Sequence, residues 1–235
     1  MGRAFEFRKV RKFKRWAKMS KAFTKIGKEI AIAVKLGGPD PHANPRLRAA
    51  MQNAKGVNMP KDRVENAIKK ASSKEAEDFQ EVVYEGYAPH GIALVIETAT
   101  DNPTRTVANI RSYFTKLGGS LGTSGSVDFM FERKGVFKLP AKEVKLDDLE
   151  MELIDFGAED IKAEEDEVMV YTSFNDFAGM QKALEEKGVP VTEANIERIP
   201  LTTKELGEEE ATEVFELIER IEEDDDVQSV YHNVA

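Results

Sequence analysis

Residues 82–119, VVYEGYAPHGIALVIETATDNPTRTVANIRSYFTKLGG, contain a change from strand-like to helical spacing of apolar residues. Val82–Tyr87 and Ile92–Thr98 are rich in β-branched and aromatic residues, and Pro89–Gly91 between them predicts a hairpin loop. Thr104–Leu117 has the three- and four-residue apolar spacing of a helix. The stretch therefore predicts two antiparallel strands followed by a helix.

The segments that follow this helix predict more α/β structure. Ser120–Ser126 is rich in glycine, and Val127–Phe131 is a candidate strand, which gives the order ββαβ. The glycines resemble a phosphate-binding loop only loosely, because the Walker A and G-x-G-x-x-G patterns are both absent, and we expect a tight connection. Further on, the pattern predicts strands over 136–139, 161–163, 168–172 and 191–199, with helices over 147–156 and 176–187. The order βαββαβ is that of a ferredoxin-like domain.

The end of the chain predicts one helix, Glu209–Glu222, and one strand, Val227–Val234. A single helix and a single strand cannot bury their apolar faces alone. We therefore expect them to complete the ββαβ unit, so that the middle domain comprises residues 77–132 plus 205–235. Residues 133–204 are then an inserted ferredoxin-like domain.

The beginning of the chain has helical spacing throughout. Ser20 is a candidate cap for a second helix, and Gly37–Pro39 predicts its end. Asn44-Pro45 predicts the start of another helix, and Pro60 the start of a last one. We expect a helical domain over 1–76. The predicted fold class is α+β, with an N-terminal helical domain followed by two α/β domains, one inserted in the other.

Charge is segregated along the chain, whose formal net charge is -9. Residues 1–75 contain 20 Lys or Arg and 6 Asp or Glu, whereas the remaining 160 residues contain 14 and 37. The first 28 residues alone carry eleven Lys or Arg and a single acid, Glu6. A basic region within an acidic chain is typical of contact with a polyanion.

The cations of the helical region are therefore candidate phosphate contacts. The first set is Lys9, Arg11, Lys12, Lys14, Arg15, Lys18, Lys21, Lys25 and Lys28; the second, near the starts of two helices, is Arg46, Arg48, Lys61 and Arg63. The alternative is a solvated surface, which we weigh equally for the second set. We expect Phe13, Trp16 and Phe23 to be core residues rather than platforms for base stacking.

Arg105 is a separate candidate. Asp101 or Asn102 can cap the helix that begins near Pro103, so Arg105 lies in its first turn, where a cation opposes the helix dipole. Such a cation needs a partner, either an internal carboxylate or a bound anion. We favour the internal ion pair and keep the anion as the alternative.

The sequence lacks the residues that several classes of function require. The chain has no cysteine and only three histidines, which are scattered, so a disulfide or zinc site is not expected. No nucleophile elbow or convergent acid–base set is visible, and we expect neither an enzyme nor a cofactor. No apolar run is long enough for a membrane span. We expect a cytoplasmic monomer without a metal.

Three stretches resemble the YebC/PmpR family: residues 37–71, residues 84–135, which include the hallmark Asp101–Thr106, and residues 224–234. The resemblance covers nearly the whole chain. Many members open with Gly-His-Ser-Lys-Trp, whereas this chain keeps Gly2 and continues RAFEFRKVRKFKRWAK. The family fold implied is a helical domain and two α/β domains, one inserted in the other.

The resemblance implies a non-enzymatic regulator of gene expression that binds nucleic acid. It implies first a DNA-binding transcriptional regulator, and second a ribosome- or RNA-associated translation factor that supports elongation or relieves stalling. The lysine-rich cations, without a visible helix-turn-helix or base-reading array, suit phosphate tracking in either case. A protein-interaction adaptor and a metal-dependent nuclease are further alternatives.

Overall fold

The computed structural model describes residues 3–73, 76–144 and 146–235, and it describes the side chains of all of these except 3–18 and 146–148. The chain divides into two compact units, residues 1–76 and 77–235, called here the helical unit and the α/β unit. Each is described by itself.

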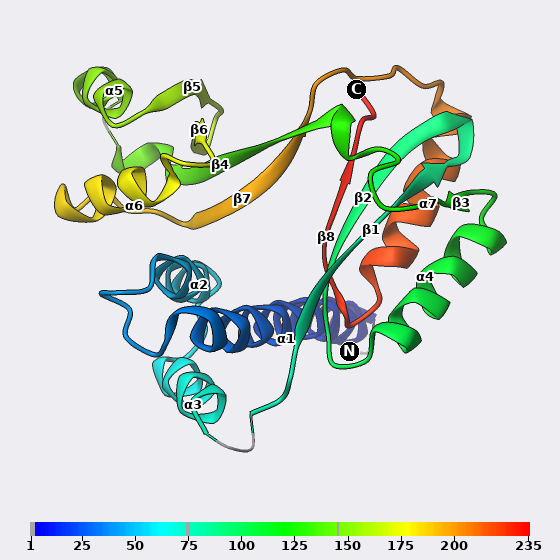
Figure 1. The fold of residues 1–235 in the computed structure, drawn as a ribbon, viewed down its shortest axis with the longest axis horizontal. Helices are drawn as coiled ribbons and strands as arrows, with labels where there is room; N and C mark the ends of the chain where they lie inside the picture. Colours follow the sequence, from blue (N-terminus) through cyan, green and yellow to red (C-terminus); the bar gives the residue numbers. More distant parts are fainter. Residues whose placement is uncertain (1–2, 74–75, 145) are drawn as a thin grey trace. The chain divides into compact units, whose positions relative to one another are not determined.

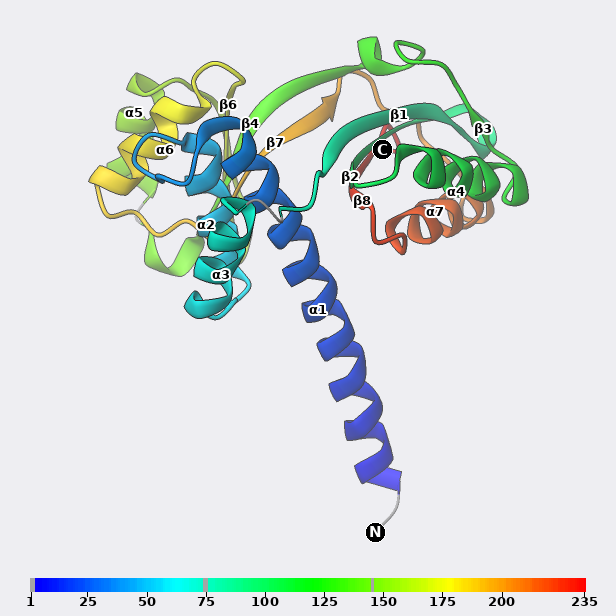
Figure 2. The ribbon, with the colours of Figure 1, turned by 60° about the horizontal axis from the view of Figure 1, so that its bottom comes forward.

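The helical unit contains α1 (Arg3–Gly37), α2 (Pro45–Gly56) and α3 (Lys61–Ala71). Figure 2 shows α1 as one uninterrupted helix, so the prediction that a second helix starts at Ser20 is wrong. The hydroxyl of Thr24 donates to the Ser20 carbonyl at 3.1 Å, one helical turn back. The apolar stripe continues through this position, and the gain from packing it outweighs the preference of serine for a cap.

The helical unit has its own apolar core, in which α1 packs against both shorter helices. Its buried residues are Ile26, Ile30, Ala33, Val34, Leu47, Ala50, Ala54 and Val64. The buried Asn44 joins α1 to α2: its amide donates to the carbonyls of Ala33 (2.7 Å) and Gly38 (2.9 Å), and its side-chain oxygen accepts from the Leu47 N–H (3.0 Å). The predicted Asn44 cap is therefore confirmed.

The first sheet of the α/β unit has the order β3-β1-β2-β8. Its strands, each antiparallel to its neighbours, are β1 (Gln80–Ala88), β2 (Ile92–Thr100), β3 (Ser120–Leu121) and β8 (Val227–His232). The loop between β1 and β2 is a short 3-10 turn, Pro89–Gly91. The last strand of the chain thus pairs with β2, about 130 residues earlier, with Ile96 opposite Val230.

Two helices, α4 (Pro103–Lys116) and α7 (Glu208–Glu222), cover one face of this sheet (Figure 1). Apolar residues of β2 and both helices form one buried cluster, including Leu94, Ile96, Phe114, Leu217 and Ile221. Burial of these side chains holds the chain's last segment against its middle.

The second sheet has the order β5-β6-β4-β7, and its strands are antiparallel. With two helices on one face it is the split-βαβ, ferredoxin-like arrangement, and the predicted fold class is confirmed. Its elements are β4 (Phe131–Pro140), a 3-10 turn (Ala141–Glu143), α5 (Leu146–Asp155), β5 (Ala158–Ala163), β6 (Glu167–Ser173), α6 (Phe177–Glu186) and β7 (Glu193–Pro200). The finer domain limits at 132/133 and 204/205 stay a prediction.

The predicted strand at Val127–Phe131 is wrong. Residues Asp128–Met130 form a 3-10 turn, β4 begins only at Phe131, and the strand beside β1 is the shorter, earlier β3. The reason is the buried carboxylate of Glu85, which accepts hydrogen bonds from the N–H groups of Val127 (2.8 Å) and Asp128 (2.9 Å). These donors are thereby withdrawn from a strand ladder.

Candidate nucleic-acid interface

The basic stripe on α1 follows from spacing. Lys18, Lys21, Lys25 and Lys28 are three or four residues apart and so lie on one face of the helix. The structure exposes Lys21, half-buries Lys25 and leaves Lys28 only 9% exposed, so a phosphate contact at Lys28 would require its side chain to be uncovered. The side chains of Lys9, Arg11, Lys12, Lys14, Arg15 and Lys18 lie outside the described ones.

The second set of cations divides into two kinds. Arg46, Lys61 and Arg63 are exposed; the Lys61 side chain is 91% exposed and 3.8 Å from Glu65, and the Arg63 guanidinium lies 5.7 Å from the centre of the half-buried Phe23 ring. Arg48 instead donates to the carbonyls of residues 41 and 42, at 2.8 and 2.9 Å. Arg48 therefore holds the α1–α2 loop, whereas the other three face solvent.

Lysines at the helix ends were missed by the sequence reasoning. Lys55 is in the last turn of α2, and Lys69 and Lys70 are in the last turn of α3; all three are exposed. Cations are favoured in the last helical turn because they complement the helix dipole. That preference, applied to the adjacent pair of lysines, could have marked them as part of the same basic surface.

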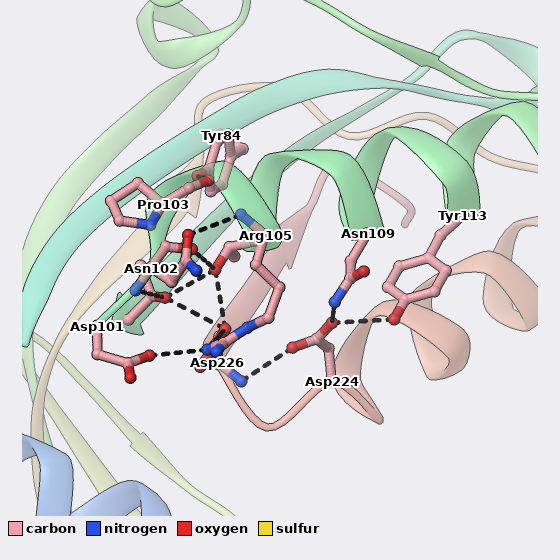
Figure 3. A network of polar contacts seen from close by, with 11 residues as sticks. Tyr84, Asp101, Asn102, Pro103, Arg105, Asn109, Tyr113, Asp224 and Asp226 are labelled. Carbon is pink, nitrogen blue, oxygen red and sulfur yellow. Dashed lines mark hydrogen bonds and ion pairs between the residues drawn. The ribbon is translucent and has the colours of Figure 1, made fainter.

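Arg105 lies at the N-terminus of α4, in the network of Figure 3. Asn102 is the cap, since its side chain accepts from the Arg105 N–H at 3.1 Å, and Pro103 is the first helical residue. The Arg105 guanidinium donates to Asp226 at 2.7 Å and to Asp101 at 2.8 Å. These hydrogen bonds, the one to Asp226 first, raise the pKa of Arg105.

Of the two partners considered for Arg105, the internal ion pair is therefore the one present. Phosphate contact by Arg105 would have to compete with both carboxylates, which are already hydrogen-bonded to it.

Asp226, just before β8, connects this network to the core. Its buried carboxylate also accepts from the hydroxyls of Thr100 (3.2 Å) and Thr106 (2.8 Å). Nearby, Asp224 accepts from the Asn109 amide at 3.0 Å and the Tyr113 hydroxyl at 2.9 Å (Figure 3). Two carboxylates from the α7–β8 loop thus attach the last strand to α4.

The glycine-rich loop is occupied by a group of the chain itself. The Glu85 carboxylate accepts from the Gly125 N–H at 2.7 Å in addition to the N–H groups of Val127 and Asp128. Burial raises the pKa of Glu85, but these three hydrogen bonds and the nearby Arg198 outweigh burial and lower it. The loop is therefore a tight connection, as expected, and the anion that its N–H groups bind is the Glu85 carboxylate.

No group of three or more His, Cys, Asp or Glu side chains among the described residues could hold a metal ion. His90 contacts Glu213 (2.8 Å) and Glu210 (3.5 Å) of α7, far in sequence from the other two histidines. Among the helices of the described chain, none is both long and apolar enough to cross a bilayer.

Comparison with known proteins finds family matches for both units of the chain. Residues 3–74 match the family model described as the TACO1/YebC protein N-terminal domain, and residues 79–234 match the TACO1/YebC second and third domain. The chain belongs to the TACO1/YebC family. The resemblance noted from three stretches of sequence is thereby confirmed for both units.

Relatives in this family align with the chain from end to end. Proteins named "Probable transcriptional regulatory protein" are 57% identical in Parabacteroides distasonis, 56% in Flavobacterium johnsoniae and 52% in Myxococcus xanthus. Each alignment covers 100% of this chain and 97%, 99% and 100% of the relative, respectively. A crystal structure of a conserved hypothetical protein from Aquifex aeolicus is 44% identical, with a TM-score of 0.84 over 93% of this chain and 91% of that one.

Proposed function

We propose that this protein is a non-enzymatic regulator of gene expression that binds nucleic acid through the cations of its helical unit. The observation that carries the proposal is the charge division: 20 Lys or Arg against 6 acids in residues 1–75, in a chain whose net charge is -9. Lys21, Arg46, Lys61 and Arg63, on α1, α2 and α3, are not buried. Cations in such positions bind phosphates and release condensed counterions.

Duplex DNA is the first target to test, because relatives that align over the full chain carry the name of transcriptional regulators. The α2 and α3 helices are joined by only four residues, with Asn58 in the left-handed region at φ 57°, which is a spacing known from helix-turn-helix pairs. No helix-turn-helix signature was visible in the sequence, and a connection this short is one of the features that such a pair requires.

Ribosomal or other structured RNA is the second candidate. The exposed cations are mainly lysines spread over three helices, and phosphate contacts by such residues carry no base sequence information. An acidic α/β unit would repel either polymer, so in both cases the helical unit makes the contact.

A charge-reversal series tests the interface. The variant Lys21→Glu/Lys61→Glu/Arg63→Glu should bind a 30-base-pair DNA or an RNA hairpin at least about tenfold more weakly, with a shallower dependence of affinity on salt. The matched control is Lys142→Glu/Lys162→Glu/Lys182→Glu, which changes the charge equally at exposed sites of the α/β unit. Equal losses in both triple variants, measured by fluorescence anisotropy, would contradict the proposal.

Crosslinking in cells separates the two targets. Recovery of promoter DNA without co-sedimentation on ribosomes supports the transcriptional role. Recovery of ribosomal or transfer RNA with ribosome co-sedimentation supports the translational role and rejects the first.

A further inference from the structure

Helix α5 of the ferredoxin-like region carries apolar side chains on both of its faces. Leu149 and Leu153 are 9% and 0% exposed and form its inner face. Met151 and Ile154, which lie on the opposite side, are 79% and 55% exposed. More than half of each of these two side chains is exposed, so that part of their apolar surface adds nothing to the stability of the fold, and neighbouring exposed apolar side chains are a feature of interaction surfaces.

Carboxylates bracket this apolar pair. At about 100° per residue, the order around the outer side of α5 is Glu150, Ile154, Met151 and Asp155 among the side chains from 149 on, which are those of this helix that the structure describes. Both acids are exposed, and within the described part of the chain neither has a salt bridge, unlike Glu152, which pairs with Lys187. The outer face is therefore an apolar ridge with an unneutralised negative charge on each side.

Two further apolar side chains are exposed near the end of the helix. Phe156 is 42% exposed and Phe174, in the turn after β6, is 48% exposed. A Cβ on Gly157 would lie 3.0 Å from the Asp176 side chain, so the end of α5 and the turn that carries Phe174 are adjacent. The rings of Phe156 and Phe174 meet the cations of Lys187 (5.7 Å) and Arg133 (4.4 Å).

We propose that the outer face of α5 docks an amphipathic protein segment whose apolar side chains are flanked by Lys or Arg. Apolar residues of the segment would cover Met151 and Ile154, while its cations would pair with Glu150 and Asp155. Nucleic acid and anionic lipid are the wrong partners for this face because both would meet its carboxylates with like charge. A second copy of this chain is disfavoured for the same reason, since a two-fold symmetric contact brings the same surface of both copies together and places carboxylates beside carboxylates.

Two synthetic helical peptides of 18 residues test the proposal, with the same leucine stripe but flanked either by lysines or by glutamates. The lysine peptide should bind the full-length protein and shift the amide NMR signals of residues 149–156. Met151→Gln/Ile154→Gln should weaken binding at least about tenfold, because two apolar side chains lose their burial. Glu150→Lys/Asp155→Lys should weaken it by a comparable factor.

The matched controls are Phe129→Gln, which removes an apolar side chain 71% exposed elsewhere, and Glu209→Lys/Glu216→Lys, which reverses two exposed acids on α7. Neither should change the affinity more than about twofold. The proposal is overturned by equal binding of the glutamate peptide, by loss in the α7 variant as large as in the α5 variants, or by absence of binding at about 1 mM peptide, the upper limit of weak affinity. If the parent protein self-associates and the Met151→Gln/Ile154→Gln variant does not, the partner of this face is a second copy of the chain and the proposal is rejected.

Discussion

The helical unit has an excess of positive charge, whereas the α/β unit contains buried ion pairs that join distant segments, and Lys61 and Arg198 illustrate the difference. In the helical unit the Lys61 side chain is 91% exposed, and its ion pair with Glu65, at 3.8 Å, is open to solvent. In the α/β unit the Arg198 side chain is 10% exposed and binds both Glu97 (2.9 Å) and Asp128. An excess of one charge remains available to a partner, whereas matched charges are used to join segments of the same chain.

The joining role is clearest for carboxylates that connect distant segments. Asp226 attaches the start of β8 to α4, and Glu85 on β1 holds the loop before β4. Arg198 on β7 reaches Glu97 on β2, and Tyr231 on β8 lies 3.4 Å from both Glu97 and the Ile196 carbonyl. Polar groups thus link the two sheets of the α/β unit. Variants that remove individual groups from each unit test whether this contrast has energetic consequences.

The largest effect is expected for Asp226→Ala. Removal of this carboxylate takes one shared acceptor from the buried hydroxyls of Thr100 and Thr106 and one ion-pair partner from Arg105, and the α/β unit should lose about 3 kcal/mol of stability. Hydrogen exchange resolved by region measures the loss, which should be confined to residues 77–235. Asp226→Asn, which retains an acceptor oxygen, should lose less; equal losses would show that hydrogen bonding is not the cause.

Glu85→Gln should cost about 2 kcal/mol at pH 7, because three backbone donors lose an ionised acceptor. The pKa of Glu85 is lowered in the folded protein, so its contribution is present above the ordinary value of 4.5 and is lost as pH falls through the lower folded value. The difference between variant and parent should therefore shrink in acid. A difference that stays constant from pH 7 to pH 3 in urea unfolding would contradict the assignment; Glu159→Gln, at an exposed site, is the control.

In the helical unit, Asn44→Ala should cost about 1.5 kcal/mol, because α2 loses its cap and two carbonyls of the α1 end lose their donor. Asn44→Asp retains the acceptor for the Leu47 N–H but not the donors, so it separates the two contributions. Hydrogen exchange should place the loss in residues 26–71. Protection unchanged in both variants would mean that the joint between α1 and α2 has no energetic role.

The smallest effect is expected for Lys182→Ala. Lys182 and Glu186 are 70% and 67% exposed and 3.6 Å apart on α6, and exposed pairs of this kind contribute less than about 0.5 kcal/mol. Thermal unfolding should be nearly unchanged. A loss comparable to that of Asp226→Ala would remove the distinction between surface pairs and buried connectors.

Much of the site depends on features visible in local sequence. Asn44 was expected as a cap, and Asn102 as one of two candidates with Asp101, because each of the two asparagines precedes a proline and a helical pattern. The ferredoxin-like order followed from alternating periods. The helix start at Ser20 and the strand at Val127–Phe131 were wrong because contacts elsewhere overrode local preference: the packed stripe of α1 in one case, and Glu85 in the other.

Charge division, proline-marked helix starts such as those after Asn44 and Asn102, and most periods of strands and helices are properties of neighbouring residues, so the linear order of the chain was sufficient to find them. Three features depend on groups brought together from 35 to 121 positions apart: the carboxylate with which Arg105 pairs across the fold, the anion that the N–H groups of the glycine-rich loop bind, and the pairing of Glu152 on α5. Only the folded chain brings these groups within hydrogen-bonding distance of one another. The basic helical unit lies between these two cases: its composition indicates a polyanion, and its folded geometry separates Arg48, which holds a loop, from the cations that face solvent.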